Sequence, residues 1–315
     1  MSEYKKLTEA DLEEIAKIVP RERILWADEV NEEYSHDELS AIPSYPDLVV
    51  RATSAEEISK VLKYANQEHI AVTPRGAGTG LVGASVAVEH GIMMDTTLMN
   101  HFLELDEENL TLTLEPGVLL MEIYQYVEPK GLFYPPDPGE KTATIGGNIS
   151  TNAGGMRAVK YGATRDYVRA MTVVLPTGEI THLGATVSKT SSGYSLLNLM
   201  IGSEGTLGII TELTLKIIPA PKAVASLIIP FEDLNTALST VPKFKMAHMD
   251  PQAIEFMERE IVLASERYIG KSVFPQELEG QQIGAYLLVT LDGNSEDEVD
   301  ALIEQAAELV LEAGA

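Results

Sequence analysis

Apolar residues recur at helical spacing between two short apolar runs in the first quarter of the chain. Between positions 58 and 65 they lie three or four residues apart, and a Ser-x-x-Glu capping pattern at Ser54 precedes them. The flanking runs 47–52 and 70–74 are typical of strands. The order strand, helix, strand predicts a βαβ unit with parallel strands.

Alternating apolar and polar residues predict strands farther along. Residues 110–114 and 208–218 alternate, and residues 171–183 hold two such runs around a Thr-Gly turn, which predicts a hairpin. The Pro-rich stretch 219–223 is typical of a boundary between folding units.

After this boundary the pattern starts again. A strand is predicted at 224–230 and another at 283–293. Ser295, followed by three acidic residues, predicts the start of a last helix. Near the N-terminus, the Thr8-x-x-Asp11 pattern predicts a short helix that ends before Pro20.

Composition excludes several classes of protein. The 315 residues are 45% hydrophobic and contain no cysteine, which excludes disulfides, thiolate metal sites and a cysteinyl link to a cofactor. No secretory signal is visible, and no apolar run approaches the roughly 20 residues of a membrane span. We therefore expect a cytoplasmic protein with no transmembrane segment.

The net charge of −25 excludes a nucleic-acid partner, because so acidic a chain repels polyanions. Any anionic ligand must be held by local groups. One region, 141–169, runs against the trend with a net charge of +4. We expect this basic region to help hold such a ligand.

The glycine-rich stretch 73–88 contains Gly78-x-Gly80-x-x-Gly83, which is the dinucleotide fingerprint read literally. A Rossmann site needs a full helix after the glycines, and too few residues remain before the next predicted strand. The glycines must therefore form a loop, whose exposed N–H groups suit a pyrophosphate. Taken alone, an ordinary glycine-rich turn explains the pattern equally well.

Two further glycine-rich segments favour the cofactor interpretation. Residues 135–168 hold several glycine pairs among threonines, serines and asparagines, and residues 201–212 place glycines just before a strand. Small residues let the backbone approach a flat or extended ligand closely.

At these residues the chain resembles a known group, the FAD-linked oxidases of the vanillyl-alcohol-oxidase superfamily with a PCMH-type FAD-binding domain. The likeness is greatest to the branch of D-lactate dehydrogenase and the glycolate oxidase FAD subunit. It rests on these motifs: PRGAGTGL at 74–81, DPG at 137–139, TIGGN at 144–148, NAGG at 152–155, KYG at 160–162 and GSEGTLG at 202–208.

The resemblance implies an α+β fold in which a PCMH-type domain of two subdomains binds FAD. It implies an N-terminal helix and lead-in at 1–45, the FAD-binding domain at 46–220, and the first part of a ferredoxin-like substrate domain at 221–315. The first glycine loop is expected at the pyrophosphate, the 137–155 loops along the flavin, and the 202–210 segment near the adenosine side or the pyrophosphate. The predicted FAD-binding residues are Pro74, Arg75, Gly76, Ala77, Gly78, Thr79, Gly80, Leu81, Asp137, Pro138, Thr142, Ile145, Gly146, Gly147, Asn148, Ser150, Thr151, Asn152, Ala153, Gly155, Tyr161, Gly162, Glu204, Gly205 and Ile210.

The FAD is expected to be non-covalent, because Thr79 stands where some members of the superfamily carry a flavin-linked histidine. The family's catalytic and metal-binding histidine motifs are absent from this sequence, and its six histidines form no pair at metal-ligand spacing. We therefore predict no metal ligands here, assign no catalytic residue, and expect the base and any divalent metal site to lie outside the given residues. The substrate domain is accordingly expected to be incomplete.

The resemblance implies an FAD-dependent dehydrogenase that oxidises a small D-2-hydroxy acid, of the D-lactate or glycolate class, to the 2-oxo acid by hydride transfer to flavin. The electron acceptor would be an electron-transfer flavoprotein, a quinone or an iron–sulfur subunit. Two alternatives stay open: a non-catalytic FAD-binding subunit that relays electrons in a complex, and another flavin oxidoreductase on the same fold.

Overall fold

The computed structural model describes residues 4–39, 43–278 and 280–315, so positions 1–3 and 40–42 of the predicted lead-in lie outside it. The chain divides into two compact units. The first comprises Met1–Tyr134, Glu140–Ala153 and Ala163–Ile218, and the second comprises Pro135–Gly139, Gly154–Gly162 and Pro219–Ala315.

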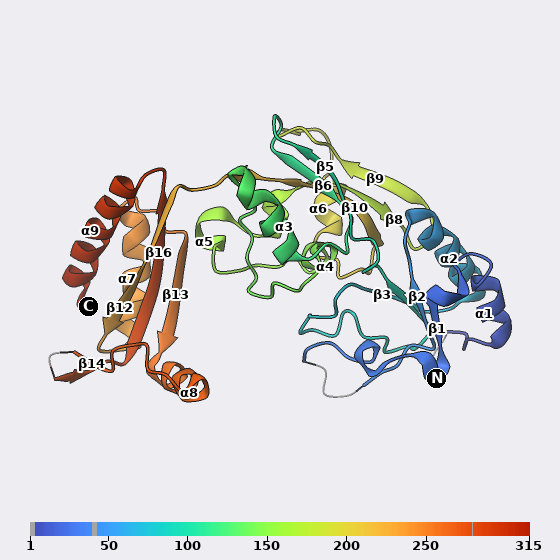
Figure 1. Ribbon diagram of the computed structural model, residues 1–315, viewed down its shortest axis with the longest axis horizontal. Helices are drawn as coiled ribbons and strands as arrows, with labels where there is room; N and C mark the ends of the chain where they lie inside the picture. Colours follow the sequence, from blue (N-terminus) through green and yellow to red (C-terminus); the bar gives the residue numbers. More distant parts are fainter. Residues whose placement is uncertain (1–3, 40–42, 279) are drawn as a thin grey trace. The chain divides into compact units, whose positions relative to one another are not determined.

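The first unit begins with a four-stranded sheet in the order β1-β2-β4-β3 (Figure 1). Strands β2, β3 and β4 are parallel and β1 is antiparallel to β2. The predicted βαβ unit is present, but β4 lies between its two strands. The elements are α1 (Glu9–Ile15), β1 (Ile24–Trp26), β2 (Leu48–Arg51), α2 (Ala55–Glu68), β3 (Val72–Arg75) and β4 (Ile92–Asp95).

Capping explains where these helices begin. Asp11 Oδ2 accepts from the backbone N–H and the hydroxyl of Thr8, at 2.9 and 2.6 Å. Helix α1 begins directly after Thr8, at Glu9. Ser54 Oγ accepts from the Glu57 N–H at 3.2 Å and begins α2. Both capping predictions are confirmed.

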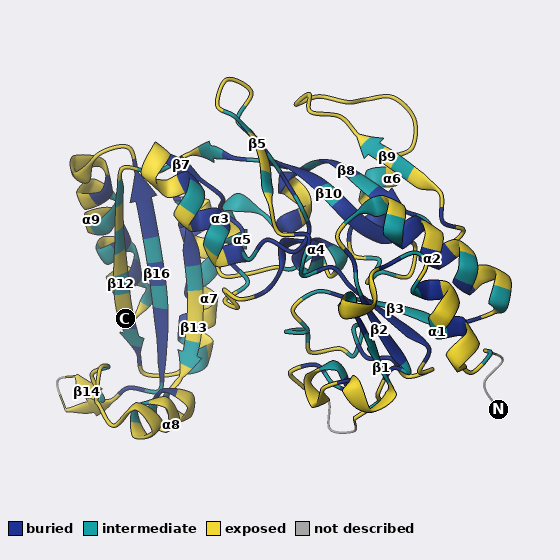
Figure 2. Cartoon of the chain, turned by 45° about the vertical axis from the view of Figure 1, so that its right-hand side comes forward, coloured by how far each residue is buried: buried dark blue, intermediate teal, exposed yellow. Residues whose placement is uncertain are grey.

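A second, antiparallel sheet of the first unit has the order β5-β6-β10-β8-β9. The predicted hairpin is the β8–β9 pair, and β10 at the sheet centre is buried along most of its length (Figure 2). The other elements are β5 (Phe102–Asp106), β6 (Thr111–Leu114), α3 (Leu120–Val127), β7 (Leu132–Phe133), α4 (Ile145–Ser150), β8 (Val168–Val174), β9 (Ile180–Gly184), α6 (Leu196–Met200) and β10 (Ile209–Lys216).

One hydrophobic core joins the two sheets of the first unit. The apolar face of α2, with Ile58 and Val61 fully buried, packs with residues of β2 and β4, and Val174 of β8 and Ile209 of β10 belong to the same cluster. The apolar residues at helical spacing between positions 58 and 65 therefore form the face by which α2 packs against both sheets.

In the second unit, β16 lies between β12 and β13 in an antiparallel sheet. Leu287, Val289 and Leu291 of β16 pack in one core with residues of α7 and α9, on the same side of the sheet (Figure 1). Ser295 caps α9 as predicted. The elements are α5 (Ala158–Tyr161), β12 (Ala223–Phe231), α7 (Leu234–Met246), β13 (Ala253–Glu258), α8 (Arg259–Ile269), β14 (Glu277–Leu278), β15 (Gln281–Gln282), β16 (Ala285–Gly293) and α9 (Glu296–Ala313); β11 (Ile218–Pro219) spans the boundary between the units.

Candidate functional site

The first glycine loop leaves the end of β3 and contains no helix. Residues 76–91 connect two adjacent parallel strands without any helix or strand, which confirms that the fingerprint does not open a Rossmann helix. Gly78 and Gly83 have φ of +75° and +78°, a region that favours glycine. Residues 76 to 80 are half-buried or exposed. A glycine loop of this kind can offer backbone N–H groups to an anion.

Arg75 lies buried beneath this loop and makes its contacts inside the protein. Its guanidinium donates to the carbonyl oxygens of Glu33, His36 and Ser85, at 2.5, 2.9 and 3.2 Å. Burial lowers the pKa of Arg75. A Cβ at Gly78 would lie 2.1 Å from Arg75 Nη2. The structure thus gives Arg75 a role in shaping the loop, which the sequence did not indicate.

Residues of the lead-in before β2 also contact the first glycine loop. Asp37 is buried, and its Oδ2 accepts from the Gly83 N–H at 2.6 Å. The Glu38 N–H donates to the Gly80 carbonyl at 3.1 Å. A segment that reads as irregular and acidic in the sequence therefore holds the glycine loop in place.

The second glycine segment lies directly against the first. Thr144 Oγ1 accepts from the Gly147 N–H at 3.4 Å, which begins α4, and a Cβ at Gly76 would lie 2.2 Å from the same oxygen. Gly146 packs on Pro116, whose Cβ would lie 2.6 Å from an added Cβ. Thr144 is absent from the predicted site residues, although its position before Ile-Gly-Gly as a helix N-cap was a readable signal.

The third glycine segment joins the other two. A Cβ at Gly205 would lie 2.3 Å from Pro74 Cγ. The N–H groups of Gly202 and Glu204 donate to the carbonyls of Ile149 and Ser150, at 3.0 and 2.8 Å. The structure therefore brings residues of all three glycine-rich segments together within the first unit.

The predicted FAD-binding residues differ in burial and in their hydrogen bonds. Ile145 and Ile210 are buried, and Asn148 is 6% exposed. The hydroxyls of Ser150 and Thr151 donate back to carbonyls of α4, at 2.8 and 3.1 Å. The exposed positions are Ala77, Leu81, Thr142, Thr151, Gly155 and Glu204, and the half-buried ones are Pro74, Gly76, Gly78, Thr79, Gly80, Pro138, Gly147, Ser150, Asn152, Ala153, Tyr161, Gly162 and Gly205.

Five predicted site residues belong to the second unit: Asp137, Pro138, Gly155, Tyr161 and Gly162. Within that unit the two short segments that carry them pack together. A Cβ at Gly155 would lie 1.8 Å from the Asp137 carbonyl oxygen, and Arg157 Nη2 lies 3.4 Å from Asp137 Oδ2.

Several cations of the basic region 141–169 already have anionic or carbonyl partners. Arg157 pairs with Asp137 and Lys160 with Asp292. Arg165 Nη2 donates to the Ile201 carbonyl at 3.3 Å. Partner carboxylates thus balance the charges of Arg157 and Lys160. The expectation that the basic region helps to hold an anionic ligand stays a prediction.

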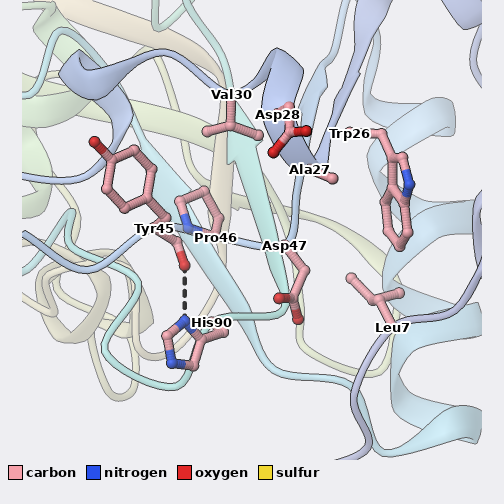
Figure 3. Close-up of a pocket in the computed structure, with 9 residues that line it drawn as sticks. All are labelled: Leu7, Trp26, Ala27, Asp28, Val30, Tyr45, Pro46, Asp47 and His90. Atoms are coloured by element: carbon pink, nitrogen blue, oxygen red, sulfur yellow. Dashed lines mark hydrogen bonds between the residues drawn. The ribbon is translucent and has the colours of Figure 1, made fainter.

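Among the described residues, no group of three or more His, Cys, Asp or Glu side chains is placed to hold a metal ion. A surface cavity of about 580 Å³ in the first unit contains none of the predicted site residues (Figure 3). His90 Nδ1 and the Tyr45 carbonyl oxygen lie 2.8 Å apart at its rim. The lining residues are Leu7, Trp26, Ala27, Asp28, Val30, Tyr45, Pro46, Asp47 and His90.

The converging glycine segments indicate a class of protein: an α+β protein with loops of the kind that bind an extended anionic cofactor. Two family models extend this conclusion. The model described as FAD binding domain matches residues 46–184, and the model described as FAD linked oxidases, C-terminal domain, matches residues 220–315. The chain belongs to the FAD linked oxidases.

Individual relatives agree with the family. A D-lactate dehydrogenase of Anaerostipes hadrus is 61% identical over 100% of this chain and 67% of its own length. The glycolate oxidase subunit GlcD of Bacillus subtilis (strain 168) is 41% identical over 82% of this chain and 54% of its own length. A D-lactate dehydrogenase of Archaeoglobus fulgidus is 41% identical over 82% of this chain and 57% of its own length. The chain thus spans about half to two thirds of the length of these relatives.

The fold has solved counterparts. A structure of alkyldihydroxyacetonephosphate synthase matches with a TM-score of 0.82 and 20% sequence identity, over 99% of this chain and 61% of that one. This likeness shows the fold alone. Together with the family models it confirms the predicted α+β fold with a PCMH-type FAD-binding domain.

FAD, the cofactor of the family, fits the residues present. Residues 76 to 80, half-buried or exposed, would offer N–H groups to an anionic group without adding charge. The close Gly76–Thr144 and Gly205–Pro74 approaches leave no room for larger side chains at the two glycines. In the described part of the chain, no helix is long and apolar enough to cross a membrane.

Proposed function

We propose that this chain forms the FAD-binding part and a portion of the substrate domain of an FAD-dependent dehydrogenase of D-2-hydroxy acids. The whole protein would oxidise a substrate of the D-lactate or glycolate class to the 2-oxo acid. The observation that carries the proposal is the 61% identity to a D-lactate dehydrogenase over the full chain. The 41% identity to a glycolate oxidase subunit supports the same substrate class.

Different segments of the predicted site would contact different parts of FAD. The N–H groups of residues 76–80 would bind the pyrophosphate, and α4 with the loop after it would lie along the flavin. Glu204 and Gly205 would contact the adenosine side or the pyrophosphate. Bound FAD would accept the two electrons, while these residues supply binding and orientation. Thr79 and the absence of cysteine favour a non-covalent complex.

The partners and the location follow from the same proposal. Electrons would leave for an electron-transfer flavoprotein, a quinone or an iron–sulfur subunit, and the protein would act in the cytoplasm. The catalytic residues stay unassigned, and the placement of the base and any divalent metal outside the given residues stays a prediction. A second candidate, an electron-relay subunit of a larger complex, is favoured by one observation: the Bacillus subtilis relative is itself named as a subunit.

Anaerobic reduction of the bound flavin separates these candidates. The natural full-length protein is mixed with D-lactate, glycolate or D-2-hydroxyglutarate, with L-lactate as the stereochemical control, and bleaching of the flavin absorbance is followed. We expect at least one D-2-hydroxy acid or glycolate to bleach the flavin and L-lactate to do so far more slowly. If dithionite bleaches the flavin but none of the hydroxy acids does, the dehydrogenase proposal is wrong and the relay candidate stands.

A further inference from the structure

A carboxylate far along the chain holds one of the predicted FAD segments. Lys160 Nζ donates to Asp292 Oδ1, and the Tyr161 hydroxyl donates to Asp292 Oδ2 at 2.5 Å. Gln252 Nε2 also donates to Oδ2, at 3.0 Å. All four residues belong to the second unit, and Asp292 follows Tyr161 by 131 positions.

The position of Asp292 in β16 explains which side of the sheet this contact uses. Leu291 points into the core shared with α7 and α9, and side chains alternate along a strand, so Asp292 points to the opposite face. Its side chain is 1% exposed and that of Lys160 is 24% exposed. A carboxylate so buried requires donors, and Lys160, Tyr161 and Gln252 supply them.

Other contacts fix the same segment within the second unit. Lys245 Nζ donates to the Val159 carbonyl at 3.3 Å and also pairs with Asp250. Arg157 pairs with Asp137. Residues 157–161 are therefore held at three points, and the Asp292 carboxylate is the one most protected from water.

We propose that Asp292 is a positioning residue for FAD binding, acting through Lys160 and Tyr161. It fixes the short helix α5 and thereby sets the place of Tyr161 and Gly162, both predicted FAD-binding residues. Asp292 lies outside the 46–184 region that matches the FAD binding domain model. Part of the FAD affinity is thus encoded in the sheet of the second unit. The inference rests on the FAD site of the proposed function and is independent of which hydroxy acid is oxidised.

The test measures FAD affinity of the natural full-length apoprotein by fluorescence titration, at a temperature where circular dichroism shows each variant folded. We expect Asp292→Asn to weaken FAD binding by about tenfold, or about 1.4 kcal/mol, which is the scale of one hydrogen bond to a charged group. The Lys160→Met/Asp292→Asn double variant should be little worse than Asp292→Asn alone, because Lys160 is proposed to act through the same carboxylate. The visible spectrum of the FAD-saturated Asp292→Asn protein should also shift, which loss of fold stability alone would not cause.

Thr290→Val is the matched control. Thr290 lies on β16 on the same face as Asp292, and its hydroxyl bonds to Ser226 at 2.9 Å, with no hydrogen bond to α5. Wild-type affinity and spectrum are expected for it. If Asp292→Asn fails to fold, Tyr161→Phe and Lys160→Met test the proposal in its place. Each is expected to weaken FAD binding, by less than Asp292→Asn would. Wild-type affinity in a folded Asp292→Asn protein, or in both substitutes, overturns the proposal. Because no turnover is measured, this failure is distinct from failure of the dehydrogenase proposal.

Discussion

Replacing Gly78 by alanine disturbs the first glycine loop in two ways. Its φ of +75° belongs to the left-handed region, where an L side chain is strained. The new Cβ would lie 2.1 Å from Nη2 and 2.5 Å from Cζ of Arg75. That guanidinium is buried and bonded to three carbonyls, so it cannot move aside without losing hydrogen bonds.

The magnitude follows from these two effects. The left-handed conformation destabilises an alanine by roughly 1–2 kcal/mol. Losing one charged hydrogen bond to a carbonyl adds roughly 1.5–3 kcal/mol. We therefore expect Gly78→Ala to lower the free energy of unfolding by about 2.5–5 kcal/mol.

Two glycines of the same loop separate the effects. Gly83 has a φ of +78° with nothing within 4 Å of an added Cβ, so Gly83→Ala should show the backbone effect alone, about 1–2 kcal/mol. Gly80 lacks a left-handed φ and an added Cβ there also meets nothing within 4 Å, so Gly80→Ala should be close to neutral.

Urea unfolding of the apoproteins provides the assay. The single tryptophan, Trp26, lies in the first unit, so its fluorescence reports the unfolding of the unit that contains the loop. The expected order of destabilisation is Gly78→Ala, then Gly83→Ala, then Gly80→Ala. Equal destabilisation by the first two variants would refute the role given to Arg75, and a strongly destabilised Gly80→Ala would refute the loop geometry.

Two further predictions concern the cofactor and the N-terminal helix. With Thr79 in place of a linking residue, acid precipitation of the holoprotein should release all flavin to the supernatant; yellow pellets after washing would show a covalent bond. Burial alone would raise the pKa of Asp11, but hydrogen bonds from Lys5, Thr8 and Tyr64 outweigh it and hold the pKa well below its usual range. This lowered pKa stabilises the fold above the unfolded pKa of about 4, and the contribution is lost as pH falls below it. Asp11→Asn should therefore destabilise by about 1–3 kcal/mol at neutral pH, with the gap to wild type narrowing in acid; a gap that is constant with pH would contradict this.

The sequence by itself determined the local elements and the class of cofactor. Thr8, Ser54 and Ser295 mark helix starts correctly, because each capping interaction joins residues only three positions apart. The glycine segments favoured an extended cofactor, because close backbone approach to a ligand requires small residues. The resemblance of their motifs to the FAD-linked oxidases then implied FAD. The FAD linked oxidase match confirms that interpretation.

Only the tertiary structure decided which distant groups meet. It placed β4 between the strands of the βαβ unit, directed the Arg75 guanidinium to carbonyls of the lead-in, and paired Lys160 with Asp292. The sequence patterns relate residues three or four positions apart along the chain. These contacts instead join residues that are from about 20 to more than 130 positions apart. Such pairings depend on how whole sheets and loops pack, so no spacing within the sequence reveals them.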